Sequence, residues 1–104
     1  SKTSKIKKII KRIKLIKDSN SGPSLEKLYN DLTSDPQNIG IILKIADMEF
    51  ANNNFENSFE ILLNNYPLDK EKIKSKLLNY FDVLGFDHKS TIEYRKKLSS
   101  IMFT

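Results

Sequence analysis

Apolar residues recur at helical spacing from the start of the chain. Within residues 1–22 they follow the i, i+3, i+4, i+7, i+10 pattern that places side chains on one helix face. Lysines occupy the positions between them, so the segment predicts a basic amphipathic first helix. Gly22-Pro23 favours its end, because Gly suits a helix C-terminus and Pro opens the segment that follows. The stripe consists of Ile6, Ile9, Ile10, Ile13 and Ile16.

The same spacing continues downstream and is divided by turn residues. It predicts a short second helix, and after it a third helix that begins with Asp35 as N-cap and Pro36 in its first turn. The Asn-rich stretch 52–54 predicts a tight turn, because Asn tolerates the left-handed backbone region. The remaining boundaries are an end of the third helix near Ala51, a fourth helix ended by Pro67, a fifth capped by Asp69 and ended by Gly85, and a sixth capped by Asp87.

The fold class follows from this spacing. No alternating strand pattern competes with it, and three Gly and three Pro are too few for a turn-rich β fold. We therefore predict an all-α protein, an antiparallel array of five or six helices joined by short loops. A length of 104 residues fits a single helical domain over residues 1–104.

The third and fourth predicted helices fit one tetratricopeptide-like helix pair. Such a unit needs small residues where its helices cross, at its eighth and twentieth positions. Counted from Ile39, these positions are Ala46 and Ser58, and Asn53 falls at the turn between the helices. Pro36 stands where the preceding unit closes. The match is partial, so we predict one degenerate repeat with irregular flanks over residues 23–103.

The last third resembles the C-terminal end of the chaperedoxins, which are thioredoxin-like co-chaperones of the YbbN type. The resemblance lies in "KSKLLNYFDVLGFDHKSTIEYRKKLSSIMF", residues 74–103, and extends more weakly upstream to residue 25. It implies the C-terminal domain of a longer, cytoplasmic, bacterial thioredoxin-like protein. It also implies protein partners, namely a chaperonin or unfolded clients, and no redox site in this part of the chain. The matching pieces are Leu77-Leu78, Phe81, Leu84-Gly85, Asp87-His88, Glu93-Tyr94-Arg95 and Leu98-Ser99-Ser100.

Charge is distributed unevenly along the chain. Residues 1–17 carry eight basic side chains and no acid, whereas the rest carries ten basic and thirteen acidic side chains, a balance of −3. For the basic stretch, packing of its isoleucines on the next helix pair is favoured. A nucleic-acid-binding module that uses the lysine face is the alternative function, although the chain lacks a recognisable reader fold. Membrane-surface binding is disfavoured because no Trp or Phe anchors the stripe, and the basic face also fits an acidic partner.

The sequence offers no set of residues for catalysis, metal binding or cofactor binding. There is no Cys, and His88 is the single histidine, best explained as a residue at a helix start. No nucleophile, base and orienting group form a recognisable set, so we predict a non-enzyme without cofactors. An ion-pair cluster of Glu93 and Arg95 with Asp82 or Asp87 is expected to brace the last two helices.

Two surfaces are candidates for partner binding. The first is the exposed polar side of the third helix, with Lys44, Asp47 and Glu49, because helix-pair arrays bind peptides in the groove along their inner helices. Tyr80 and Tyr94 are expected to bury their rings and keep their hydroxyls in water. The second surface is the C-terminal helix, where Arg95, Lys96 and Lys97 are predicted to point outward and Met102-Phe103 to be exposed at the tip.

Overall fold

The computed structural model describes residues 24–103. The predicted first helix, and with it the whole basic stretch, lies outside the described residues. The described part is all-α, as the sequence predicts. Its helices are α2 (Leu25–Ser34), α3 (Ile39–Ala51), α4 (Phe55–Asn64), α5 (Lys70–Leu84) and α6 (Lys89–Met102), with one 3-10 turn, η1 (Tyr66–Leu68), between α4 and α5.

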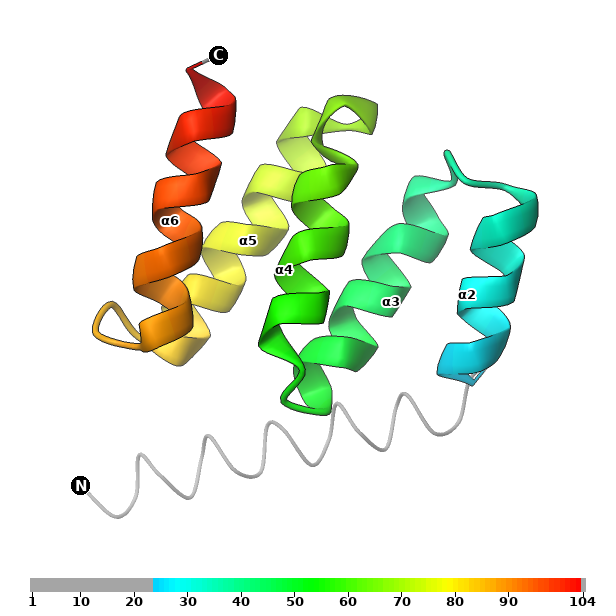
Figure 1. The fold of residues 1–104 in the computed structure, drawn as a ribbon, viewed down its shortest axis with the longest axis horizontal. Coiled ribbons are helices and arrows are strands. Elements are labelled where there is room, and N and C mark those ends of the chain that lie inside the picture. Colours follow the sequence, from blue (N-terminus) through cyan, green and yellow to red (C-terminus); the bar gives the residue numbers. More distant parts are fainter. Residues whose placement is uncertain (1–23, 104) are drawn as a thin grey trace.

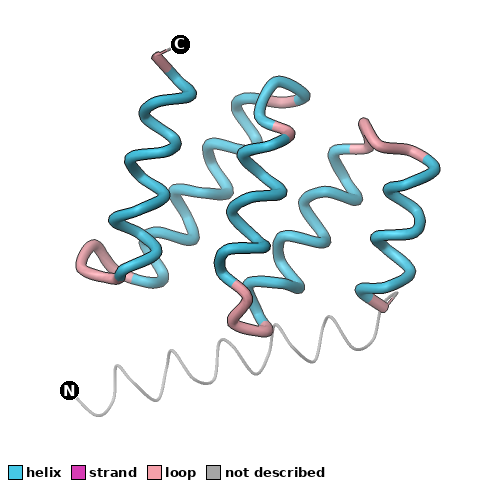
Figure 2. Tube along the Cα trace, viewed as in Figure 1, coloured by secondary structure: helices cyan, strands magenta, loops and turns pink. Residues whose placement is uncertain are grey.

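The helices form an antiparallel array, with α2, α4 and α6 upright in Figure 1 and α3 and α5 slanting between them. Short loops join successive helices at alternating ends, which is the arrangement that loops of this length impose (Figure 2). Each helix packs against its neighbour in sequence, and α4 also packs against α6. Helix α4 is therefore central, because it contacts α3, α5 and α6.

An aromatic cluster fills the core around α4. Phe59 is fully buried, and its ring centroid lies 5.0 Å from that of Tyr94 and 5.6 Å from that of Phe81. Both pairs meet edge to face, which is a favoured geometry for aromatic rings. Phe50 and Tyr80 stack nearly parallel with centroids 4.3 Å apart. One cluster thus joins α3, α4, α5 and α6.

The third helix begins later than the sequence predicts. Its N-cap is Asn38, whose side chain accepts a hydrogen bond from the backbone N–H of Ile41 at 3.2 Å. Asp35 instead closes α2, where its own backbone N–H donates to the last turn. The prediction of Asp35 as N-cap and Pro36 in the first turn is therefore wrong. Residues 35–37 form the turn, and Asn38 stands where the first backbone N–H groups of α3 need an acceptor.

The caps of the last two helices differ in how well the sequence predicts them. Asp69 caps α5 as expected and accepts from the backbone N–H of Lys72 at 3.1 Å. The cap of α6 is His88 and not Asp87, because Nδ1 of His88 accepts from the backbone N–H of Ser90 at 3.1 Å. The single histidine thus has a structural role at the helix start.

Two residues with positive φ end helices. Asn53, with a φ of 66°, follows α3 and turns the chain toward α4. Gly85 follows α5 with φ 97° and ψ 155°, a backbone region that is essentially restricted to glycine. These turns return the chain so that the next helix runs antiparallel to the previous one.

Candidate functional site

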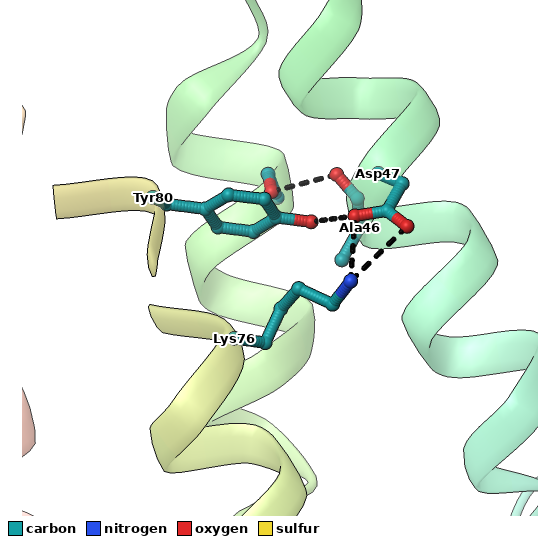
Figure 3. Close-up of polar contacts among 5 residues, drawn as sticks. Ala46, Asp47, Lys76 and Tyr80 are labelled. Carbon is teal, nitrogen blue, oxygen red and sulfur yellow. Dashed lines mark hydrogen bonds and ion pairs between the residues drawn. The ribbon is translucent and has the colours of Figure 1, made fainter. Parts of the chain in front are cut away.

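The crossing of α3 and α4 sets the position of the site. Ala46 and Ser58, the small residues of the predicted repeat, are both fully buried. Oγ of Ser58 donates to the carbonyl oxygen of Ala46 at 2.8 Å (Figure 3). Small side chains let the two backbones approach, and the hydrogen bond satisfies the buried hydroxyl. The crossing thereby fixes the next residue of α3, Asp47, on the side that faces α5.

Asp47 is the centre of a polar cluster between α3 and α5 (Figure 3). Its carboxylate accepts a hydrogen bond from the hydroxyl of Tyr80. Nζ of Lys76 lies 3.1 Å from Oδ1 and 3.2 Å from Oδ2 of the same carboxylate. Burial, the charge of Asp47 and the hydrogen bond to it all raise the pKa of the Tyr80 phenol, so this hydroxyl remains a donor.

Beside this cluster lies an open surface depression, here called the α3–α5 hollow, with a volume of about 400 Å³. Glu71, Ser75 and Asn79 of α5 recur at i, i+4 and i+8, and Lys72 and Lys76 lie next to this row, so α5 contributes one of its faces. The buried residues of α5, Ile73, Leu77, Tyr80 and Phe81, lie on its other side. The hollow is lined by Leu43 of α3 and by Glu71, Lys72, Ser75, Lys76 and Asn79 of α5.

The charges around the α3–α5 hollow are largely balanced. Lys76 pairs with Asp47, and Nζ of Lys72 lies 3.9 Å from Oδ2 of Asp69. An acidic ligand would have to compete with both carboxylates. The hollow therefore suits a peptide of mixed polar and apolar side chains better than a strongly acidic one.

Of the three groove residues predicted on α3, Lys44 is exposed and Asp47 is half-buried in the cluster. The expected exposure of Glu49 is wrong, because only 3% of this residue is accessible. Its Oε2 accepts from the hydroxyl of Tyr29 at 2.7 Å, and its Oε1 accepts from Nδ2 of Asn54 at 3.1 Å. Glu49 thus ties α2 and the following turn to α3. A buried carboxylate is stable there because these donors satisfy it.

Tyr80 and Tyr94 bury their rings, as expected, but their hydroxyls donate to carboxylates of neighbouring helices, contrary to the expectation that they stay in water. The hydroxyl of Tyr94 donates to Oε1 of Glu60 at 3.1 Å, which links α6 to α4. Burial together with Glu60 raises the pKa of Tyr94. Burial and the hydrogen bond to Glu49 raise the pKa of Tyr29 to about 12. In each case burial disfavours the charged phenolate, and the nearby carboxylate favours the neutral phenol further.

The basic residues predicted on the last helix fall into two groups. Lys97 binds Glu60 at 3.0 Å and lies 3.9 Å from Glu93, so it braces α6 against α4. Arg95 and Lys96 are exposed, and within residues 24–103 neither has a carboxylate at ion-pair distance. The expected cluster that joins Glu93 and Arg95 to the end of α5 is therefore wrong. The guanidinium of Arg95 lies instead over the ring of Phe86, 5.3 Å from its centroid.

Sequence reasoning missed the α5 side of the hollow. No role was predicted for Ser75, Lys76 or Asn79, which line the hollow. The i, i+4, i+8 row of Glu71, Ser75 and Asn79 is the signal that identifies the exposed stripe of α5. The binding partner of Lys76, Asp47, lies 29 residues earlier in the chain, and no local pattern connects the two.

The described residues give no indication of a metal site or a membrane span. Within residues 24–103 no three side chains of His, Asp or Glu gather in a way that holds a metal ion. None of the helices in that range has the length and apolar character needed to cross a bilayer.

Antiparallel helix pairs, small residues at the crossing and an open depression beside the inner helices define a helical-repeat interaction module. Comparison with known families agrees with this class: the tetratricopeptide repeat model matches residues 18–103, and the chain belongs to that family. Neither the curated proteins nor the solved structures include a match to this chain. Tetratricopeptide repeats generally mediate protein–protein interactions and are typically non-catalytic.

Proposed function

We propose that this chain is the non-catalytic C-terminal domain of a thioredoxin-like co-chaperone and that it binds a chaperonin or unfolded clients. Two features support the proposal. The family is one of protein-interaction modules, and the stretch 74–103 resembles the ending of the chaperedoxins. In this stretch the buried residues Leu77, Phe81 and Leu98 hold the end of the array together.

The α3–α5 hollow is the observation that carries the proposal. It lies between two helices of an array, it is open to solvent, and Leu43 gives it an apolar element among polar side chains. An unfolded client presents short segments of mixed character, and the balanced charges of the hollow do not reject them. Lys44 is exposed on α3 and is available to contact such a segment.

The test uses the full 104-residue chain with two probes: a permanently unfolded protein, reduced and carboxymethylated α-lactalbumin, and a purified bacterial chaperonin. Ser75→Arg places a long side chain in the hollow at an exposed position. Asn57→Arg places the same side chain at an exposed position of α4 and serves as the matched control. Binding is measured by fluorescence anisotropy of the labelled domain.

We expect at least one probe to bind and Ser75→Arg to weaken that binding by about tenfold, which corresponds to 1.4 kcal/mol. Asn57→Arg should leave the Kd unchanged. The proposal would be overturned if neither probe bound the wild-type chain, or if both variants behaved alike.

A further inference from the structure

Helix α6 is the last helix of the described array, and its outward side is exposed. Ile92, Lys96, Ser99 and Phe103 recur at i, i+4, i+7 and i+11, so they form one stripe along the helix. The buried residues of α6 (Thr91, Tyr94 and Leu98) point the other way, into the core. We call the stripe and its flanking residues Arg95 and Ser100 the α6 outer face.

The α6 outer face is apolar at both ends. Ile92 is 47% exposed and Phe103 is 85% exposed. Phe86, which precedes the helix and lies under the guanidinium of Arg95, is 71% exposed. Large side chains exposed in one neighbourhood mark an interaction surface more often than single exposed residues do.

A depression of about 660 Å³ lies along the α6 outer face, and all six of its residues line it. Ser99 and Ser100 are small, so they leave room between the larger side chains of Arg95, Lys96 and Phe103. Ile92 and Phe103 are separated by eleven positions, which on a helix is about 16 Å. The face is thus long enough for roughly three turns of a second helix, which packs by fitting its ridges of side chains into such a groove.

The charge of the face identifies the kind of partner. Arg95 and Lys96 lie between its apolar ends, and within the described residues no carboxylate is close enough to pair with either cation. From residue 86 to residue 103 the chain has four basic and two acidic side chains, a balance of +2. A second copy of α6 would bring cations against cations. The basic stretch 5–17 of the same chain carries no acid and is disfavoured for the same reason.

We infer that the α6 outer face binds an amphipathic helix with acidic side chains, whose apolar residues cover Ile92 and Phe103 and whose carboxylates pair with Arg95 and Lys96. The position of these residues on one exposed helix face supports a helix-in-groove mode of recognition. The surface is separate from the α3–α5 hollow, because no lining residue is shared. Substitutions in the hollow therefore leave it unaffected, and the two proposals fail independently.

The test uses the full chain and three synthetic 18-residue peptides. One peptide has leucines at i, i+3, i+4, i+7 and i+11, which form one face of a helix, and glutamates on the opposite face. The second replaces the glutamates by lysines, and the third scrambles the acidic peptide so that the leucine stripe is lost. Anisotropy of each labelled peptide is measured at low and moderate salt.

We expect the acidic peptide to bind at least about tenfold more tightly than the other two, which is 1.4 kcal/mol or more. The double variant Arg95→Glu/Lys96→Glu should lose that preference and favour the lysine peptide. Phe103→Ser should weaken the binding of both the acidic peptide and the lysine peptide. The control variant Lys70→Glu/Lys74→Glu changes the net charge equally but lies on α5, so it should leave the preference in place.

Several results would overturn the inference. Equal binding of the acidic and scrambled peptides would indicate general attraction between opposite charges. Equal effects of the two double variants would remove the role of Arg95 and Lys96. A dimeric chain that Phe103→Ser converts to a monomer, as measured by sedimentation, would assign the face to a second copy. Circular dichroism of each variant checks that these substitutions leave the helical fold intact.

Discussion

The hydrogen bond between Tyr80 and Asp47 is predicted to be a main link between α3 and α5. The ring of Tyr80 is held in the core by stacking on Phe50, and its hydroxyl reaches the carboxylate of Asp47. A hydrogen bond to a charged acceptor contributes on the order of 1.5–3 kcal/mol. The ion pair of Lys76 with Asp47 is partly exposed and contributes about 0.2–1 kcal/mol. The phenol is therefore expected to contribute more than the lysine.

A double-mutant cycle separates these contributions. Tyr80→Phe should lower the free energy of unfolding by about 1–2 kcal/mol, and Asp47→Ala should lower it by about 2–3 kcal/mol because the second change also leaves the phenol without its acceptor. The coupling energy between the two sites should be about 1–2 kcal/mol. In a domain of this size, 1 kcal/mol corresponds to a shift in Tm of about 4–8 °C.

Urea unfolding followed by circular dichroism gives the four free energies. The exposed pair of Lys27 and Asp31, with its atoms 3.1 Å apart on α2, is the matched control. Its cycle, from Lys27→Gln and Asp31→Asn, should give a coupling of about 0.3–0.5 kcal/mol. The reasoning is refuted if the Tyr80–Asp47 coupling is no larger than that of the control pair.

Three further predictions concern a buried hydroxyl, the end of α5 and the pH. Thr91→Val should raise the free energy of unfolding by about 1 kcal/mol, because Oγ1 of Thr91 is buried with no hydrogen-bond partner among the described residues; lower stability of the variant in urea would show that the hydroxyl is satisfied. Gly85→Ala should lower Tm, because a residue with a side chain is strained by about 1–3 kcal/mol at a φ of 97°. The added Cβ would also lie 3.3 Å from Oδ1 of Asp87. An unchanged Tm would contradict this backbone geometry. Stability should also fall above pH 10, because burial raises the pKa of Tyr29 to about 12 and that of Tyr80 in the same direction, whereas unfolded tyrosines ionise near 10. The unfolded state then loses protons first. The stability that these tyrosines contribute is therefore complete below about pH 10 and is lost as the pH rises through their folded pKa values. A urea midpoint that is equal at pH 8 and pH 11 would exclude this pH dependence.

The periodicity of the sequence predicts the helices better than their caps. The apolar rows of α3, α4 and α5 are long enough to identify each helix and its buried face. The N-caps of α3 and α6 were misplaced because Asp35 and Asp87 compete with Asn38 and His88, and the choice depends on which side chain reaches a free backbone N–H. The crossing residues Ala46 and Ser58 were identifiable because their spacing within a helix pair is fixed.

The candidate site was only partly predictable for a different reason. Solvent exposure of a charged residue depends on what packs over it, and Glu49 is covered by the neighbouring helix that supplies Tyr29. Lys97 is exposed as predicted, but its ion pair with Glu60 on α4 was not predicted. Both cases involve partners distant in the sequence, which helical periodicity does not connect. Arg95 and Phe103 were assigned correctly to the exposed side, because no described helix packs over that side of α6.

Three tyrosines each join one helix to a carboxylate on another: Tyr29 to Glu49, Tyr80 to Asp47, and Tyr94 to Glu60. All three acceptors lie on α3 or α4, so the flanking helices are attached to one central pair. The curvature of a helical array depends on small rotations between its units, and these attachments restrict such rotations. The chain consequently presents its depressions in nearly final shape, and a ligand loses little affinity to the ordering of the receptor.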